Sequence, residues 1–355
     1  MKMQIEIYNM TVLNDKLNIS LEAVCDSFSS LLWDIEYYKC GAFEVYIAAS
    51  PRNIEIFQTG RIVGRDDDKE HFGLIESVEL ETNAEDGDYL IIKGRFLMCL
   101  LERRIIYPTF NFTKLVSYSQ IVMNVVQHNA CTAGIRKIPG LVVGCSSGSC
   151  WDAKTKLQVS YDNLMEWVYT ICEKIGGTAN IRLIKTNNEQ YEMIFELSQG
   201  TDRSILQEVN PHIIFSDRYN NLLSFTYFTD TSFKKNYAYV LGKGEGEKRK
   251  RTTYFEGTEP SSLERHEVYV DAKDISDEEQ ENGETKPLSE EEYSELLKEK
   301  GKQSLVPITM KSESQIAVQS TQFQYGVDYF IGDFVTVEHH RFGICLLYTS
   351  PSPRD

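Results

Sequence analysis

The sequence predicts a mostly β protein with an α+β middle, in which two antiparallel β-barrel-like domains flank a small α+β region. Toward both ends of the chain, apolar and polar residues alternate with a period of two, which is typical of half-buried strands. Between these parts, apolar residues recur every three or four positions, as they do on the buried face of a helix. The chain has 355 residues, the length of two or three domains.

The first domain, residues 1–109, is expected to be organised around a hairpin. Two alternating runs, 72–82 and 88–96, are separated by a segment that ends in Asp86-Gly87, a typical hairpin turn. In the first run one face is expected to carry Leu74, Val78 and Leu80, and the other face mostly Glu76, Glu79 and Glu81. Further strands are predicted over 3–8, 31–38 and 43–47, with turns at 14–15 and 48–51.

A short helix is expected after Gly94, where the apolar period changes to about 3.6 residues. Its apolar side would consist of Leu97, Leu100, Leu101 and Ile105. We expect this helix to plug the sheet, and the domain to end near Pro108.

The second domain, residues 110–212, is predicted to hold two helices and a hairpin. The first helix is expected over 114–130, with Thr113 as its N-cap. Its apolar face would consist of Leu115, Ile121, Val122, Val125 and Val126. Residues 134–151 have the composition of a loop. The second helix is expected to be capped by Ser160, to end at Gly176-Gly177, and to bury Leu164, Trp167, Val168, Ile171 and Ile175. The hairpin is predicted over 181–185 and 191–197, with its turn at Asn187-Asn188.

The third domain, residues 213–344, is predicted to be β-rich again. Its expected strands are 212–216, 222–230, 236–242, 251–255, 266–272, 315–319, 328–331 and 334–338. An acidic insertion at about 274–303 carries a helix, which starts with the capping box Ser289 to Glu292 and has a narrow apolar stripe of Tyr293, Leu296 and Leu297. Residues 345–355 abandon the strand pattern. We interpret them as an adapter-derived scar that is not native, so the natural chain is expected to continue past Ile344.

The composition excludes several classes of protein. The formal net charge is −16, whereas a nucleic-acid reader needs clustered Lys and Arg, and binding to anionic membranes needs the same. Eight cysteines at irregular spacings are too sparse for a disulfide scaffold and indicate a reducing cytoplasm. The N-terminus lacks the apolar core of a signal peptide, and no apolar run approaches the roughly 18–20 residues of a membrane span.

One group of residues could bind zinc. His128, Cys131, Cys145 and Cys150 have the pattern H-x2-C…C-x4-C, and the segment between them is rich in Gly and Ser. Against zinc, the first two residues lie at the end of an apolar helix, and C-x4-C is a loose spacing. The alternative is that the cysteines are ordinary core and loop thiols.

Other motifs favour structural interpretations. The glycine-rich segment 242–251 lacks the G-x4-G-K-[ST] spacing of a phosphate-binding loop, so a strand–loop–strand connection is expected, whose basic residues could touch an acidic neighbour. The acidic runs 66–68 and 277–279 lack the spaced ligands of a calcium loop. His339 and His340 are adjacent on a strand and therefore point to opposite faces. No nucleophile motif such as G-x-S-x-G is present, so we predict no enzyme, and assign no catalytic or cofactor-binding residue.

A series of short pieces in fixed order resembles a known family. The pieces are Gly41-x-Phe43-Glu44-Val45, Gly73-x-Ile75-Glu76, Gly94-Arg95 with Leu100-Leu101-x-Arg103-Arg104-Ile105-Ile106, Arg136-x-Ile138-Pro139-Gly140, Gly200-x-Asp202-Arg203-Ser204, Phe215-Ser216, Asn221-Leu222, Tyr239-Val240-x-Gly242-x-Gly244-x-Gly246, Glu267-x-Tyr269-Val270-Asp271-Ala272 and Tyr325-x-x-Asp328-Tyr329-x-x-Gly332-Asp333-x-Val335-Thr336-Val337. In these pieces the chain resembles the "gp thirty-seven-like" virion proteins of siphophage and prophage tails.

The resemblance implies a structural virion protein of the baseplate or tail hub. Such a hub would be a trimer whose two barrels per chain form a ring around the DNA channel. Its partners would be the distal tail protein, the tape-measure protein and tip or fibre proteins, with no sequence-specific nucleic acid and no membrane insertion. It would be assembled in the host bacterial cytoplasm and end in the virion. In this context Arg103 and Arg104 are candidates for ion pairs between subunits, the alternative being a solvated helix end.

Two alternatives remain open at this point. The chain could be the N-terminal part of a tail-associated cell-wall hydrolase whose catalytic domain is missing. It could also be a carbohydrate-binding module for the host surface, for which the aromatic-rich run 222–228 would suit.

Overall fold

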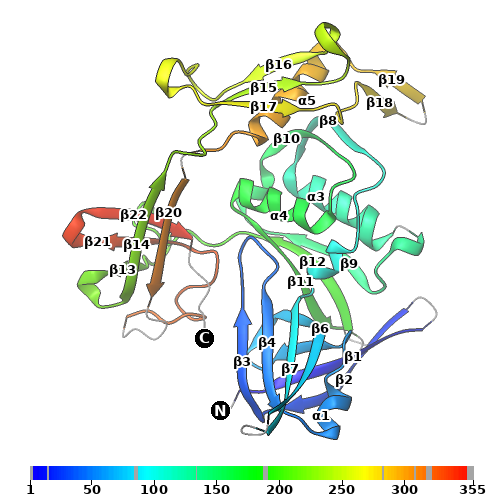
Figure 1. Ribbon diagram of the computed structural model, residues 1–355, viewed down its shortest axis with the longest axis vertical. Helices are drawn as coiled ribbons and strands as arrows, with labels where there is room; N and C mark the ends of the chain where they lie inside the picture. Colours follow the sequence, from blue (N-terminus) through cyan, green and yellow to red (C-terminus); the bar gives the residue numbers. More distant parts are fainter. Residues whose placement is uncertain are drawn as a thin grey trace.

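The computed structural model describes residues 3–13, 16–83, 87–132, 134–186, 191–281, 284–307, 309–316 and 322–349. The protein is mostly β, with helices concentrated in the middle of the chain. Figure 1 shows the N-terminal sheet at the bottom, the helices above it, a small β-rich unit with α5 at the top, and the last strands at the left.

The N-terminal part forms one antiparallel sheet of seven strands, in the order β2-β1-β5-β6-β7-β4-β3. The strands are β1 (Ile5–Leu13), β2 (Lys16–Cys25), β3 (Phe28–Asp34), β4 (Ala42–Ala48), β5 (Ile62–Arg65), β6 (Asp68–Asn83) and β7 (Gly87–Phe96). Within the described residues no pairing joins β2 to β3, so this sheet is open.

The predicted hairpin is confirmed, because residues 73–83 of β6 pair with the whole of β7. Most of its turn, like the predicted turn at 14–15, lies outside the described residues. Sequence patterns missed β2, β5 and the helix α1 (Pro51–Ile56), which Ser50 caps where a plain turn was expected.

The predicted sharing of one face by Leu74, Val78 and Leu80 is wrong. The register of β6 against β7 shifts between Ile75 and Ser77, so Glu76 is an extra residue that moves the following side chains to the other face. Leu74 is buried among the residues of the helical middle, whereas Val78 packs against the sheet's own core. Leu80 is 56% exposed.

The short helix α2 (Cys99–Glu102) follows β7 as predicted, but it does not plug the sheet. Leu97, Leu100 and Leu101 belong to the core cluster of the helical middle, and none of them belongs to the sheet's own cluster. Ile105, expected on the same apolar side, is 47% exposed. The helix therefore joins the sheet to the middle of the molecule.

The middle of the chain packs helices against short sheets. Its elements are β8 (Phe110–Ser117), α3 (Tyr118–Val126), β9 (Leu141–Ser146), β10 (Lys154–Val159), α4 (Leu164–Ile175), β11 (Thr178–Lys185) and β12 (Tyr191–Ser198). A π-helical turn, Gln127–Cys131, extends α3. β11 and β12 form the predicted hairpin, whose turn at 187–188 lies outside the described residues. The supposed loop at 134–151 contains β9, which runs parallel to β12.

Both helix starts differ from prediction. Residues 110–117 form a strand, so Ser117 caps α3 in place of Thr113, and Leu115 is 64% exposed. Asn163 caps α4 in place of Ser160, with its side chain accepting hydrogen bonds from two backbone N–H groups. The end of α4 is as predicted, since Gly176 takes the left-handed conformation (φ 74°) that favours glycine.

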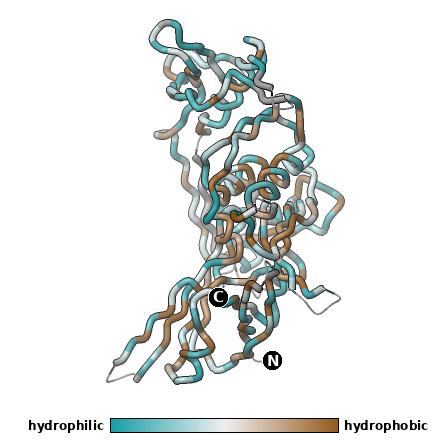
Figure 2. Tube along the Cα trace, turned by 90° about the vertical axis from the view of Figure 1, so that its right-hand side faces the viewer, coloured by the Kyte–Doolittle hydropathy of each residue, from teal (hydrophilic) through white to brown (hydrophobic). Residues whose placement is uncertain are grey.

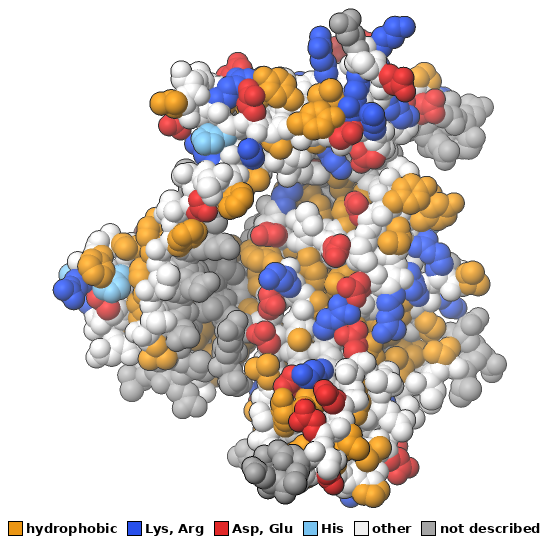
Figure 3. All heavy atoms as spheres, in the orientation of Figure 1, with side chains coloured by type: hydrophobic (Ala, Val, Ile, Leu, Met, Phe, Trp, Pro, Cys, Tyr) orange, Lys and Arg blue, Asp and Glu red, His pale blue; other side chains and the backbone are white. Residues whose placement is uncertain are grey.

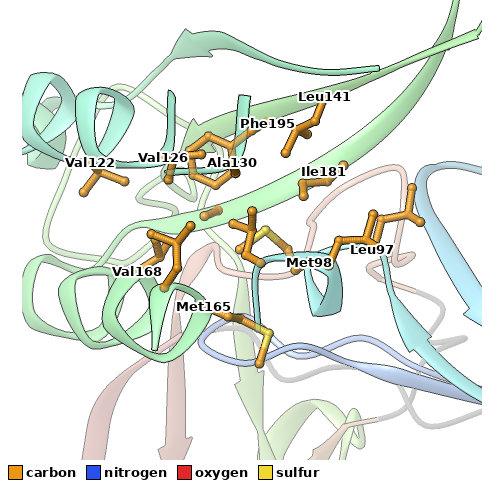
Figure 4. Packing of buried hydrophobic residues seen from close by; sticks show 14 of the residues in the cluster. Leu97, Met98, Val122, Val126, Ala130, Leu141, Met165, Val168, Ile181 and Phe195 are labelled. Carbon is orange, nitrogen blue, oxygen red and sulfur yellow. The ribbon is translucent and has the colours of Figure 1, made fainter. Parts of the chain in front are cut away.

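Apolar side chains from α2, α3, α4 and the sheet of β11, β12 and β9 fill one large core (Figure 4). The predicted helix positions Ile121, Val122, Val125 and Val126 are all buried in it. Figure 2 shows hydrophobic residues along these segments. Burying one such side chain contributes about 1.5–3 kcal/mol, so this shared core holds the N-terminal sheet and the middle together.

The last third forms several small sheets. Its elements are β13 (Ile214–Ser216), β14 (Leu222–Asp230), β15 (Tyr237–Leu241), β16 (Arg251–Tyr254), β17 (Glu267–Asp271), β18 (Glu278–Glu281), β19 (Glu284–Pro287), α5 (Glu290–Gln303), β20 (Thr309–Ile316), β21 (Phe334–His339) and β22 (Ile344–Thr349). They pair as β13-β21-β22, β14-β20, β16-β15-β17 and β18-β19. No closed barrel is found in the described part of either end of the chain.

Most of the expected strands of this part are found as β13 to β17 and β21, and the predicted helix is present. The capping box of Ser289 and Glu292 is present, and Tyr293, Leu296 and Leu297 are buried on the sheet formed by β15 and its neighbours. The strand expected over 328–331 is a turn. The strand pattern does not stop at 345, because β22 pairs with β21 as far as Thr349. Residues 317–319, part of another expected strand, lie outside the described residues, and the origin of residues 345–355 remains a prediction.

Candidate functional site

A cleft of about 810 Å³ opens where three parts of the chain meet. Its walls come from the N-terminal sheet, from the β11–β12 hairpin, and from the segment that leads into β21. These three parts of the chain are far apart in the sequence. Charged side chains of both signs line it, and Figure 3 shows red and blue side chains interspersed over the middle of one face.

Asp68, at the start of β6, is the centre of the first group in this cleft. Its carboxylate accepts hydrogen bonds from Trp33 Nε1 at 3.0 Å and from His71 Nδ1 at 2.9 Å, and from the backbone N–H of Glu70 and His71. Burial alone would raise the pKa of Asp68, but the hydrogen bond and charge of His71, with the other donors, lower it to about 2. Asp68 therefore stays ionised, and it ties β3 to β6.

A second group ties the N-terminal sheet to the middle. The guanidinium of Arg182, on β11, contacts Glu70 of β6 at 3.1 Å and also pairs with Glu196 of β12. Asn180 donates to the backbone carbonyl of Glu70 at 2.7 Å. Arg65 pairs with Asp67 at 2.8 Å beside them.

A third group ties the last strands to the rest. Asp333, 3% exposed, accepts hydrogen bonds from Arg203 Nε at 2.8 Å, from the backbone N–H of Thr201 at 2.7 Å and from that of Phe330 at 3.0 Å. Next to it, the Tyr37 hydroxyl accepts from the N–H of Gly200 at 2.9 Å.

Two glycines allow this close approach. A Cβ on Gly200 would lie 1.9 Å from the carbonyl oxygen of Gly332, and a Cβ on Gly332 would lie 2.0 Å from the Tyr37 ring. Gly332 also has a φ of +87°. Only glycine fits both positions, so the joint depends on the backbone itself.

Most ionisable side chains of the cleft are bound to one another. The hydrogen bonds and ion pairs above engage five of its carboxylates, those of Asp67, Asp68, Glu70, Glu196 and Asp333. The Cys145 thiol donates to Glu196, whose hydrogen bond and charge raise the pKa of the thiol, so the thiolate is disfavoured.

The four candidate zinc ligands are not brought together. The described residues contain no group of three or more His, Cys, Asp or Glu side chains that could hold a metal ion. His128 lies against the ring of Phe110, and Cys145 is on β9 beside Glu196. Burial raises the pKa of Cys131 to about 11 and also raises the pKa of Cys150, as expected for ordinary thiols.

The glycine-rich segment 242–251 is the strand–loop–strand connection that was predicted, between β15 and β16. Its basic residues do touch acidic neighbours, since Lys243 pairs with Asp277 at 2.8 Å and Arg249 pairs with Asp271.

The remaining candidates have local partners. Asp66 accepts a hydrogen bond from the backbone N–H of Gln4. His339 faces Asp217 at 3.5 Å, whereas His340 lies against Arg218. Within the described ranges, no helix is long and apolar enough to cross a membrane.

Arg103 and Arg104 lie just after α2, beside a third arginine that the sequence analysis did not single out as a site residue. Arg104 Nε donates to the backbone carbonyl of Arg136, and Arg104 Nη1 donates to that of Arg103 at 2.9 Å. Arg136 belonged to one of the pieces that carried the family resemblance, but nothing in its spacing indicated that it would meet Arg104.

Comparison with known proteins identifies the family. A family model described as "Siphovirus ReqiPepy6 Gp37-like protein" matches residues 5–346. The chain belongs to this Gp37-like family. The resemblance found in the sequence is thereby confirmed. A search of curated protein sequences finds no match.

Solved structures of phage and prophage tail proteins share the fold of this Gp37-like protein. The tail protein of Neisseria meningitidis MC58 is 12% identical with a TM-score of 0.54, covering 99% of this chain and 91% of its own. The prophage tail protein gp18 of Listeria monocytogenes EGD-e is 11% identical with a TM-score of 0.51, covering 99% and 89%. The 43 kDa tail protein of prophage MuSo2 from Shewanella oneidensis is 11% identical with a TM-score of 0.52, covering 98% and 93%.

The family and the fold together support a structural role in a phage or prophage tail.

Proposed function

We propose that the protein is the hub of a siphophage or prophage tail, which links the distal tail to tip or fibre proteins and surrounds the DNA channel. The observation that carries the proposal is the family match over residues 5–346, together with tail-protein folds that align over nearly the whole chain. The cleft adds support, because its charged groups hold three parts of one chain together.

The proposed hub is a homotrimer in which the two β-rich ends of each chain share one ring. The N-terminal sheet has its own apolar core, and in the described part of the chain its edge strands β2 and β3 each pair on one side. The sheet of β13, β21 and β22 has a separate small core. Open edges carry unpaired backbone groups that a neighbouring subunit could pair, so that a barrel would be completed in the assembly. Its partners would be the distal tail, tape-measure and tip proteins, after assembly in the host cytoplasm.

The net charge of −16 suits a channel for DNA. Acidic side chains facing the channel would repel phosphates and so prevent the genome from sticking during ejection. Replacing channel-facing acids by lysines and measuring the ejection rate tests this part, and an unchanged rate would contradict it.

The oligomer mass of the purified full chain tests the hub directly. Light scattering should give about 122 kDa for three copies of the 40.8 kDa chain, either alone or after mixing with the distal tail protein. A monomer under both conditions would overturn the trimer. Antibody labelling of whole particles should mark the distal end of the tail, and labelling elsewhere would overturn the hub.

A further inference from the structure

Three arginines that meet between the N-terminal sheet and the helical middle form a cluster, here called the arginine pocket (Arg103, Arg104 and Arg136). They line a hollow of about 470 Å³. Arg136 Nη1 donates to the carbonyl of Tyr107 at 3.4 Å, and its Nη2 donates to that of Ile105. Together with the hydrogen bonds of Arg104 to backbone carbonyls, these contacts hold two guanidinium groups in place.

No carboxylate within the described ranges pairs with any of these three arginines. Several other arginines do have acidic partners, as in the pairs Arg95–Glu76, Arg182–Glu196, Arg203–Asp333, Arg249–Asp271 and Arg265–Glu267. Burial, followed by the charges of Arg136 and Arg103, lowers the pKa of Arg104. The nearby Glu102 forms its ion pair with Arg95, so its charge acts on Arg103 only from a distance. The three arginines therefore concentrate positive charge in a chain whose net charge is −16.

The rim of the arginine pocket is apolar and exposed. Ile135 is fully exposed, Tyr161 is 68% exposed, Tyr107 is 55% exposed and Ile105 is 47% exposed. Tyr161 has a φ of 59°, a backbone conformation that is strained for residues other than glycine. Its ring lies beside that of Tyr107. Arg and Tyr beside aliphatic side chains are the composition of protein interfaces.

We propose that the arginine pocket docks a carboxylate-bearing segment of another protein, with an Asp or Glu side chain in the hollow and an apolar residue on the rim. A planar guanidinium binds a carboxylate through two parallel hydrogen bonds. The guanidinium groups of Arg104 and Arg136 are already held in position, so less conformational freedom is lost on binding. DNA phosphate is the poorer fit, because it would leave the apolar rim exposed and would be repelled by the net charge of the chain. The proposal goes beyond the tail role and does not depend on it.

The test uses the full chain and two synthetic peptides, acetyl-Leu-Glu-Glu-Leu-amide and its uncharged counterpart acetyl-Leu-Gln-Gln-Leu-amide. Calorimetric titration at low salt should detect tighter binding of the glutamate peptide, and salt should weaken it. The charge at Ile135 can be varied without disturbing the core, since that side chain is fully exposed. One charge about 6 Å away changes affinity roughly threefold in water, so Ile135→Lys should bind about tenfold more tightly than Ile135→Glu.

Two controls and two alternatives complete the experiment. Leu263→Glu is the matched control, since Leu263 is 93% exposed on a different part of the chain, and it should leave peptide binding unchanged. Arg104→Gln with Arg136→Gln should abolish the preference for glutamate, with a thermal melt to confirm folding. Equal binding of the two peptides would overturn the proposal. Tighter binding of a twelve-nucleotide thymidine oligonucleotide than of the glutamate peptide, if it responds to the charge at position 135, would also overturn the proposal. A change in the chain's own oligomer mass in Ile135→Glu would overturn it too, because it would assign the surface to a second copy.

Discussion

The buried ion pair of Asp333 and Arg203 should control how firmly the last strands are attached. Asp333→Asn keeps the shape of the side chain but removes the negative charge, and it leaves Arg203 with an uncompensated charge at a site where its side chain is 17% exposed. Breaking a buried pair from one side costs about 3–5 kcal/mol. The lower figure corresponds to an approximately 150-fold rise in local opening, at 1.36 kcal/mol for each factor of ten.

Hydrogen exchange read by mass spectrometry measures that opening. Peptides that cover β21 and residues 200–204 should lose protection in Asp333→Asn, while peptides from α4 should not. The matched control is Asp277→Asn, which breaks the pair with Lys243 in which both side chains are more than a third exposed. A surface pair of this kind contributes about 0–1 kcal/mol, so Asp277→Asn should raise local opening less than about fivefold. Protection of β21 within twofold of wild type in Asp333→Asn would refute the reasoning.

Three further predictions concern stability. The folded state lowers the pKa of Asp68 from 3.8 to about 2, so the stability that Asp68 contributes is fully present above about pH 4. As the pH falls toward 2, about 2 kcal/mol of the free energy of unfolding should be lost. Acid unfolding of the wild type and of Asp68→Asn measures this loss, which should be missing in the variant. Gly332→Ala should destabilise the protein by more than about 2 kcal/mol in urea unfolding, because the φ of residue 332 is +87° and the new Cβ would overlap the Tyr37 ring. Gly257→Ala is the control: Gly257 also has a positive φ but lies in open space, so this change should cost about 1 kcal/mol. Ser289→Ala removes the capping box of α5 and should cost about 1 kcal/mol, seen as faster exchange in α5 alone; a uniform change along the chain would contradict a local cap.

Elements with strong local signals could be predicted from the sequence. The β6–β7 hairpin, the end of α4 at Gly176 and the capping box at Ser289 each depend on residues close together in the chain. The errors arise where a tertiary contact decides between two local options. Residues 110–117 carry apolar side chains that fit a helix or a strand, and pairing with β10 makes them a strand. The extra residue Glu76 in β6 is likewise defined only by its partner strand.

The sites depend even more on contacts that are distant in sequence. Arg182 meets Glu70 across 112 positions, and Asp333 meets Arg203 across 130. No spacing rule brings such residues together. From the sequence, Arg103 and Arg104 are candidates for ion pairs between subunits, with a solvated helix end as the alternative. Arg136 joins them through the short helical turn Gly134–Arg136, which no spacing in the sequence indicates.

The proposed assembly would use the edges and exposed strands of the described part of this chain. β14 is nine residues long and mostly exposed, and Leu223 and Phe228 on it are 68% and 50% exposed. Among the residues that the structure describes, β20 is the one strand that pairs with β14. A two-stranded ribbon with apolar side chains in water is marginally stable at best, and exposed edges invite pairing with other chains. In the proposed hub these same features become contacts between neighbouring subunits, so a monomeric variant should be aggregation-prone as well as unable to form a tail.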